Sequence, residues 1–120
     1  MYLYLCNKYR KRMNSEQRHI RIEVPGKLHM MFMDKVIEEY GTYHAQWKAL
    51  HILIEKYVNS QKKIIKRPVE PSKGFRVISN TLPADLKAKL KDRIYMEYGT
   101  ERAFSKGVID LIKMYVNNEI

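Results

Sequence analysis

The chain has 120 residues, of which 45% are hydrophobic and 30% are charged, and its formal net charge is +10. This composition agrees with one globular domain, the single cysteine excludes an intramolecular disulfide, and no apolar run approaches the ~20 residues of a membrane span. The apolar opening of the chain is too short for the core of a signal peptide, so we expect a soluble, intracellular protein.

Nearly the same segment occurs twice in this sequence. A shift of 58 residues places Arg18–Asn59 on Arg76–Asn117 without a gap, and 16 of the 42 aligned pairs are identical. Register kept over this length indicates a duplicated folding unit. Because a unit of about 42 residues is near the lower limit for burying a core of its own, we expect the two units to share one core.

The first predicted element is a strand. Polar and apolar residues alternate in Arg18–Val24, which is the period of a half-buried strand, and Arg76–Leu82 keeps the same register in the second copy. The expected outward side chains are those of His19, Arg21, Glu23, Val77, Ser79 and Thr81. Asn80 takes the place of an inward isoleucine, so we expect it to find a hydrogen-bond partner or to lie near the edge of the core.

Two helices are predicted after each strand. Pro25 and Pro83 stand where a proline suits the first turn of a helix, and apolar residues then recur at every fourth position. These residues are Leu28, Phe32, Val36 and Tyr40, matched by Leu86, Leu90, Ile94 and Tyr98. The next residues, Gly41 and Gly99, suit the left-handed end of a helix. Thr42 and Thr100 could be the N-caps of the second helices, although Ser105 could cap a later start of the second helix in the second copy. Trp47 is interpreted as a core or interface residue.

The segments outside the repeats are basic. Residues 1–16 form a predicted N-terminal extension, and residues 60–74, which hold two prolines, form a predicted linker. The linker can span about 50 Å when extended, whereas the helix before it is only ~25 Å long. The second strand can therefore return and pair with the first. The predicted fold is α+β and mostly helical, a two-stranded antiparallel ribbon on four helices within residues 17–120.

The order strand, helix, Gly-Thr turn and helix, found at residues 17–59 and again at 75–120, resembles the ribbon-helix-helix family of DNA-binding regulators. Members of that family work as homodimers of short chains, so this chain is similar to a tandem, pseudo-dimeric member of the kind found in crenarchaeal viruses. The resemblance implies a sequence-specific transcriptional regulator. Its ribbon would enter the major groove of double-stranded DNA at promoter or operator sites.

The resemblance makes the six outward strand residues the base-reading candidates. Arg21 can donate two hydrogen bonds to guanine, and Glu23 can accept one from cytosine. Val77 offers only an apolar contact, which departs from the polar residue expected there, and a solvent-exposed strand face is the alternative. Because the two strands carry unlike side chains, we expect a non-palindromic site.

The phosphate candidates lie at the helix starts and in the basic segments. Thr42 and Thr100 would support anion sites at the starts of the second helices, although capping alone also explains them. Lys48 and Lys106 are an identical pair further along, where solvated lysines are an equal alternative. The remaining candidates are Arg10, Lys11, Arg12, Lys62, Lys63, Lys66 and Arg67, which would neutralise phosphates without reading sequence. Solvated basic tails are again the alternative.

An enzyme is not expected. The four histidines show no metal-ligand pair at helical spacing, and the chain contains no glycine-rich phosphate loop. We therefore expect no metal, cofactor, small-molecule substrate or membrane partner. Two other functions stay open: a protein-interaction module of the antitoxin or partition type, and a structural protein that coats DNA through self-association. Met30, Met31 and Met33 would suit a surface for self-association, or would fill gaps in the core.

Overall fold

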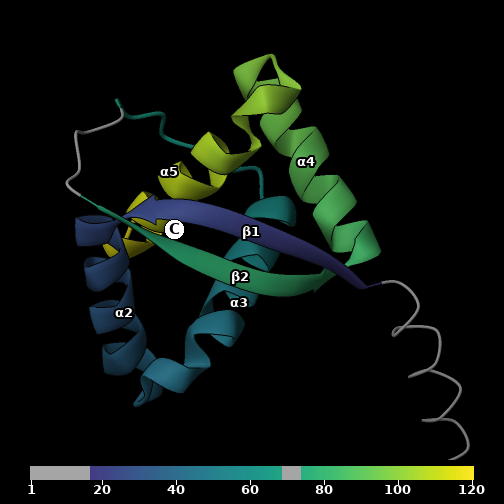
Figure 1. Ribbon diagram of the computed structural model, residues 1–120. Coiled ribbons are helices and arrows are strands. Elements are labelled where there is room, and N and C mark those ends of the chain that lie inside the picture. The colour runs from purple at the N-terminus through teal and green to yellow at the C-terminus, as the bar shows by residue number, and fades with distance from the viewer. Residues whose placement is uncertain (1–16, 69–73) are drawn as a thin grey trace, which may run out of the picture.

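The computed structural model of this protein describes residues 17–68 and 74–120, and it has the predicted α+β, mostly helical architecture (Figure 1). The first set of elements is β1 (Gln17–Pro25), α2 (Gly26–Tyr40), the 3₁₀ turn η1 (Tyr43–Ala45) and α3 (Gln46–Val58). The second set is β2 (Phe75–Pro83), α4 (Ala84–Tyr98), η2 (Glu101–Ala103) and α5 (Phe104–Val116). Every element of the second set begins and ends 58 residues after its counterpart.

The two strands pair with each other in an antiparallel ribbon, as predicted. Ile22 lies opposite Ile78, and the side chains on this face of the ribbon are buried against the helices. Asn80 is also on this face and is only 6% exposed. Its side-chain amide donates to the main-chain carbonyl of Trp47 at 3.3 Å, so the expected hydrogen-bond partner is present. This bond ties the ribbon to the first turn of α3.

The first helix of each unit packs its apolar stripe on the ribbon. The stripes predicted from the sequence are buried except for their last residue, a partly buried tyrosine in both helices. Gly41 and Gly99 have φ values of 81° and 77°, which confirms the left-handed helix ends. Pro25 and Pro83 are the last residues of their strands, with ψ values of 137° and 144°. Each proline therefore stands directly before the first helical residue, one position earlier than expected.

The second helices complete one core to which both units contribute. They begin at equivalent residues, so Ser105 lies within the first turn of α5 and does not cap a later start. The helices α4 and α5 lie close together at Gly107 of α5, where an added Cβ would lie 2.7 Å from Cδ1 of Ile94 in α4. Only glycine allows α5 to lie this close to α4. The counterparts in the first unit are Ala49 and Val36, both buried.

A polar cluster joins α3 of the first unit to α4 of the second. The Tyr57 hydroxyl donates to the Glu97 carboxylate, and the Arg93 guanidinium lies 4.3 Å from the ring centre of Tyr57 and 3.8 Å from the Glu97 carboxylate. Burial and, after it, the hydrogen bond to Glu97 raise the pKa of Tyr57, so its hydroxyl stays protonated as the donor. The cluster therefore links the units through a neutral donor and a charged acceptor.

The equivalent residues form the same cluster between α5 and α2. Tyr115 donates to Glu39 at 2.7 Å, and Lys35 lies 5.2 Å from the Tyr115 ring centre and 3.3 Å from the Glu39 carboxylate. The hydrogen bond from Tyr115 is the main cause that lowers the pKa of Glu39. The tyrosine and the glutamate are identical in the two copies, and arginine replaces lysine. The duplication thus preserves the contacts between its two units.

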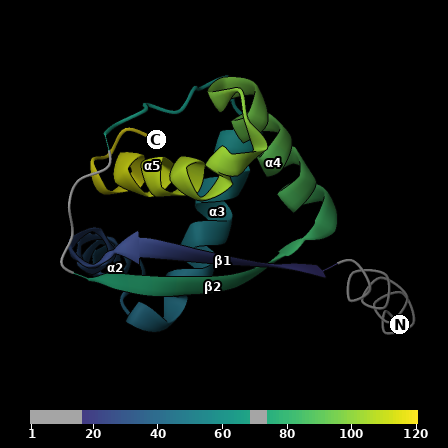
Figure 2. The same cartoon turned by 45° about the horizontal axis from the view of Figure 1, so that its top comes forward.

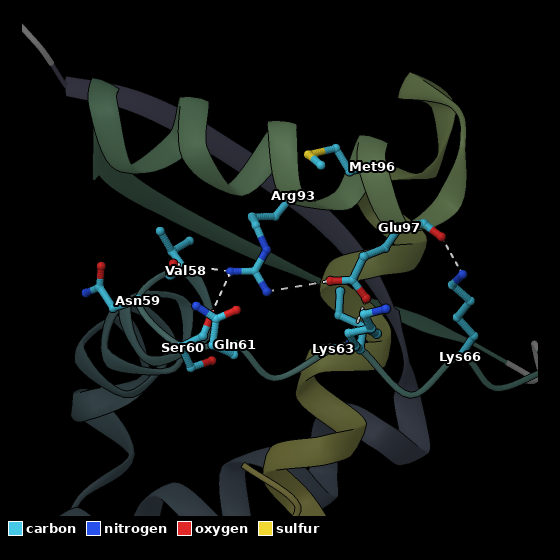
Figure 3. A pocket seen from close by; sticks show the side chains of 10 residues that line it. Val58, Asn59, Ser60, Gln61, Lys63, Lys66, Arg93, Met96 and Glu97 are labelled. Atoms are coloured by element: carbon cyan, nitrogen blue, oxygen red, sulfur yellow. Dashed lines mark hydrogen bonds and ion pairs between the residues drawn. The ribbon is translucent and has the colours of Figure 1, made fainter.

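Residues 60–68 form a strap that crosses the ends of α4 and α5, with α5 lying between the strap and the ribbon (Figure 2). Ile64 of the strap is 6% exposed, and its N–H donates to the Glu97 carboxylate at 2.8 Å. Arg67 pairs with Glu119 at 2.6 Å. Arg93 donates to four main-chain carbonyl groups, those of Tyr57, Val58, Ser60 and Lys62. Figure 3 shows Arg93 beside Val58 and Ser60. This part of the predicted linker is therefore packed on the domain.

Candidate nucleic-acid interface

The exposed face of the ribbon is organised about an approximate two-fold axis. Arg21 pairs with Ser79 in the ribbon, and Ser79 is also the residue 58 positions after Arg21, which makes it the counterpart of Arg21 in the repeat. A residue that pairs with its own counterpart lies on the symmetry axis. The axis that relates the two units therefore passes between arginine on one strand and serine on the other.

Three cross-strand pairs cover this face, and we call them rungs. They are His19 with Thr81, Arg21 with Ser79, and Glu23 with Val77. All six side chains are exposed, and they alternate along the strands with the residues that are buried against the helices, so they lie on the other face of the ribbon. In Figure 1 the helices lie behind the ribbon. The structure thus brings together, on one surface, the six residues that the sequence singled out as outward. The two end rungs are related by the axis, but their side chains are unlike.

The three rungs differ in how far their side chains are already hydrogen-bonded. The Nε2 atom of His19 and the Oγ atom of Ser79 lie 2.8 Å apart, which links two rungs diagonally. Lys87 of α4 donates to the main-chain carbonyl of His19 at 3.1 Å and ties β1 to the helix beneath it. Arg21 and Glu23 bond to no side chain within residues 17–68 and 74–120. Their charged groups are therefore available to an external partner.

The starts of the second helices lie on opposite sides of the ribbon in Figure 1. Thr42 accepts a hydrogen bond from the N–H of His44 at 3.2 Å, and Thr100 accepts one from the N–H of Arg102 at 3.2 Å. Each threonine caps the 3₁₀ turn and not the helix itself, because three residues of 3₁₀ turn precede α3 and α5. The expected caps are thus present one turn before the helices.

The identical lysines of the second helices have different surroundings. Lys48 is exposed and forms no bond to any residue that the structure describes. Lys106 binds the Asp110 carboxylate, which is completely buried, and the main-chain carbonyl of Arg67. Asp110 also accepts from Tyr98, and Ile52 stands in its place in the first unit. Lys106 therefore has an internal role that Lys48 lacks.

The strap does not bring its cations to the ribbon. Lys62 and Lys63 are exposed, whereas Lys66 donates to the main-chain carbonyl of Glu97, and Arg67 is paired internally. Arg10, Lys11 and Arg12 lie outside the described residues. Phosphate contacts from these segments stay predictions.

Two further cations at the ribbon were not singled out from the sequence. Arg18 and Arg76 are exposed, are identical at the repeat offset, and stand at opposite ends of the ribbon opposite Leu82 and Val24. They are the first aligned pair of the repeat, and the presence of arginine in both copies is the sequence signal that could have identified them. Arg76 also lowers the pKa of the nearby His29, after burial as the larger cause.

A cavity of about 720 Å³ lies between the strap and α4 (Figure 3). Its central polar groups, Arg93 and Glu97, are bonded to the chain itself, so the cavity offers a ligand few unpaired hydrogen-bonding groups.

Within the described ranges, no three His, Cys, Asp or Glu side chains gather into a metal site, and no helix has the length and apolarity to cross a membrane. No family model, curated protein or solved structure matches this chain.

Proposed function

We propose that this chain is a tandem ribbon-helix-helix protein that binds double-stranded DNA sequence-specifically and regulates transcription. Its ribbon would enter the major groove. The observation that supports this most is the ribbon face itself, where three exposed rungs lie about a two-fold axis and between two helix starts, and where Arg21 and Glu23 bond to no described side chain. A buried or internally bonded strand face would not offer such groups to a partner.

The dimensions of the ribbon fit the groove. Outward residues on a strand recur about every 6.8 Å, which equals two base-pair steps of ~3.4 Å. Three rungs therefore cover about four to five base pairs. A major groove about 12 Å wide admits a two-stranded ribbon.

The chemistry of the rungs favours an oriented site. Arg21, on the axis, would donate to O6 and N7 of a guanine, while Ser79 opposite it would accept or donate to either strand. At one end, Glu23 suits the amino group of cytosine, and the exposed Val77 suits a thymine methyl group. The other end offers polar His19 and Thr81. Because the two ends differ, the preferred sequence would not be a palindrome.

The phosphate contacts would come from both sides of the ribbon. The unpaired amides at a helix start favour phosphate, and Thr42 and Thr100 shape those turns. Three exposed cations lie near these places: Lys48 in the first turn of α3, Arg18 in β1 and Arg76 in β2. Lys66, Arg67 and Lys106 are bonded within the protein, so their charges are already paired. Contacts of this kind add affinity without reading sequence.

Selection of bound duplexes from a random pool tests the proposal. The wild-type protein should enrich one non-palindromic sequence, and Arg21→Ala should lose about 1–3 kcal/mol of preference at one base pair. Lys56→Ala removes an exposed charge from the last turn of α3 and is the matched control, which should keep the wild-type sequence. Enrichment of no sequence by the wild type, or equal weakening of all sequences by Arg21→Ala, would contradict the proposal.

A further inference from the structure

The two units have diverged into opposite shapes around their helix turns. In the first unit, Tyr43 and Trp47 lie about one helical turn apart and are 58% and 59% exposed. Trp47 is therefore not a core residue, and of the two interpretations the interface residue stays open. The second unit has the charged Glu101 in place of Tyr43 and the much smaller Ser105 in place of Trp47. We call Tyr43 and Trp47 the aromatic knob.

The second unit instead has a cavity at its turn. The cavity measures about 390 Å³ and lies between α4 and the start of α5, within the range of ligand-sized pockets. Its apolar wall is formed by Ala88, Ile94, Tyr95 and Phe104. The equivalent of Ala88 in the first unit is Met30, which has a longer side chain and is 64% exposed.

Charge also distinguishes the knob from the cavity. Asp92 and Glu101 line the cavity together with one cation, Lys91. Asp92 has an identical counterpart in Asp34, so the difference in charge comes from Glu101, which stands where the first unit has Tyr43. Residues 42–54 contain no acidic residue and include the exposed Lys48, which forms no bond to any described residue. An acidic-rimmed apolar hole thus faces outward on one unit, and a basic-flanked aromatic protrusion faces outward on the other. These are complementary surfaces.

The two surfaces cannot meet within one molecule, because the α2–α3 turn and the α4–α5 turn lie on opposite sides of the ribbon (Figure 1). We infer that the aromatic knob of one copy docks in the cavity of a second copy. Every such contact leaves one knob and one cavity free at the two ends of the pair. Contacts of this head-to-tail kind continue in one direction unless their rotation closes a ring.

This association needs no DNA, so it stands apart from the proposed function. On DNA it would give successive copies one common orientation, because the contact joins a first unit to a second unit. Oriented copies suit the unlike ends of the ribbon. A symmetric contact between two first units would reverse every second copy.

Two variants separate the knob from the cavity. Trp47→Ala removes the knob and leaves the cavity, whereas Ala88→Met fills the cavity with the residue found at the equivalent exposed position of the first unit and leaves the knob. Both positions are exposed, so both variants should fold, and their thermal unfolding by circular dichroism checks this. Glu101→Lys, which reverses a charge at the cavity, is a second cavity variant.

Sedimentation velocity over a range of protein concentrations gives the test. The wild type should form species that grow with concentration, and each variant alone should associate at least about tenfold more weakly. An equimolar mixture of Trp47→Ala and Ala88→Met should form a two-copy complex and grow no further, because one partner supplies the only knob and the other the only cavity. Glu101→Lys should replace Ala88→Met in this mixture with the same result.

Met96→Ala is the control, because Met96 is 79% exposed on α4 and does not line the cavity. This variant should assemble like the wild type. A wild type that stays monomeric up to about 1 mM, a mixture that associates no better than its components, or an equal defect in Met96→Ala would each overturn the inference. None of these results depends on whether the protein binds DNA.

Discussion

Substitution of Gly107 by alanine tests whether the close contact between Gly107 and Ile94 determines how α4 and α5 pack. The added Cβ would lie 2.7 Å from Cδ1 and 2.9 Å from Cγ1 and Cγ2 of Ile94, whose side chain is 1% exposed. Overpacking of this kind costs about 1–3 kcal/mol, and the better helix propensity of alanine returns about 0.5–1 kcal/mol. We expect Gly107→Ala to lower the free energy of unfolding by about 1 kcal/mol.

The first unit shows how the clash is relieved. It has Ala49 where α5 has Gly107, and Val36 where α4 has Ile94, so one carbon has moved from one helix to the other. Ile94→Val alone should cost about 0.5–1.5 kcal/mol through the lost methyl group. Together, the two substitutions reproduce the pair of the first unit. We expect the double variant to be at least as stable as the wild type, with a coupling energy of ~2 kcal/mol.

Urea unfolding followed by far-UV circular dichroism measures the four proteins of this cycle. The reverse cycle in the first unit, Ala49→Gly with Val36→Ile, is the matched control and should show coupling of the same sign. Single effects that add within about 0.5 kcal/mol in the double variant would refute the reasoning. They would mean that the close approach at Gly107 does not set the fit between α4 and α5.

Three other substitutions test the remaining contacts. Tyr115→Phe should lower the free energy of unfolding by ~1 kcal/mol at pH 7 and by less in acid. The pKa of Glu39 is lowered from 4.5 in the folded state, so the stability that its charge contributes is lost as the pH falls through that lower value. Urea unfolding at pH 7 and in acid checks this. Arg93→Ala should cost about 2–3 kcal/mol in thermal unfolding, and Arg93→Lys should recover less than half, because an ammonium group cannot reach four carbonyl groups. Replacing Lys62 and Lys63 by alanine should reduce the salt dependence of DNA binding by at most about two counterions, and a changed sequence preference would contradict a phosphate role.

The elements could be predicted from the sequence because their signals are local and occur twice. Alternation over Arg18–Val24 and the Gly-Thr step at residues 41–42 depend on near neighbours in the chain, and the repeat offset carried both to the second unit. The strap could not be predicted, because Ile64 is buried and its N–H is bonded to Glu97, which lies 33 positions away in the sequence. A basic, aperiodic segment shows no local sign of that partner.

The candidate site divides in the same way. A period of two was enough to place the six outward side chains on one face, but the axis at Arg21 and Ser79 required the strand register. Lys48 and Lys106 are identical in the repeat and were given one role from the sequence. The structure separates them, because buried Asp110 binds one lysine and Ile52 stands at the equivalent place beside the other. Identity within a repeat does not ensure an identical environment.

Methylation interference tests most directly whether the ribbon reads bases in the major groove. The duplex recovered by selection is methylated at guanine N7, which faces the major groove, and bound and free fractions are compared for the wild type and Arg21→Ala. We expect methylation of one guanine within about five base pairs to prevent wild-type binding and to have little effect on Arg21→Ala. The same interference pattern for both proteins, or none for the wild type, would contradict the claim.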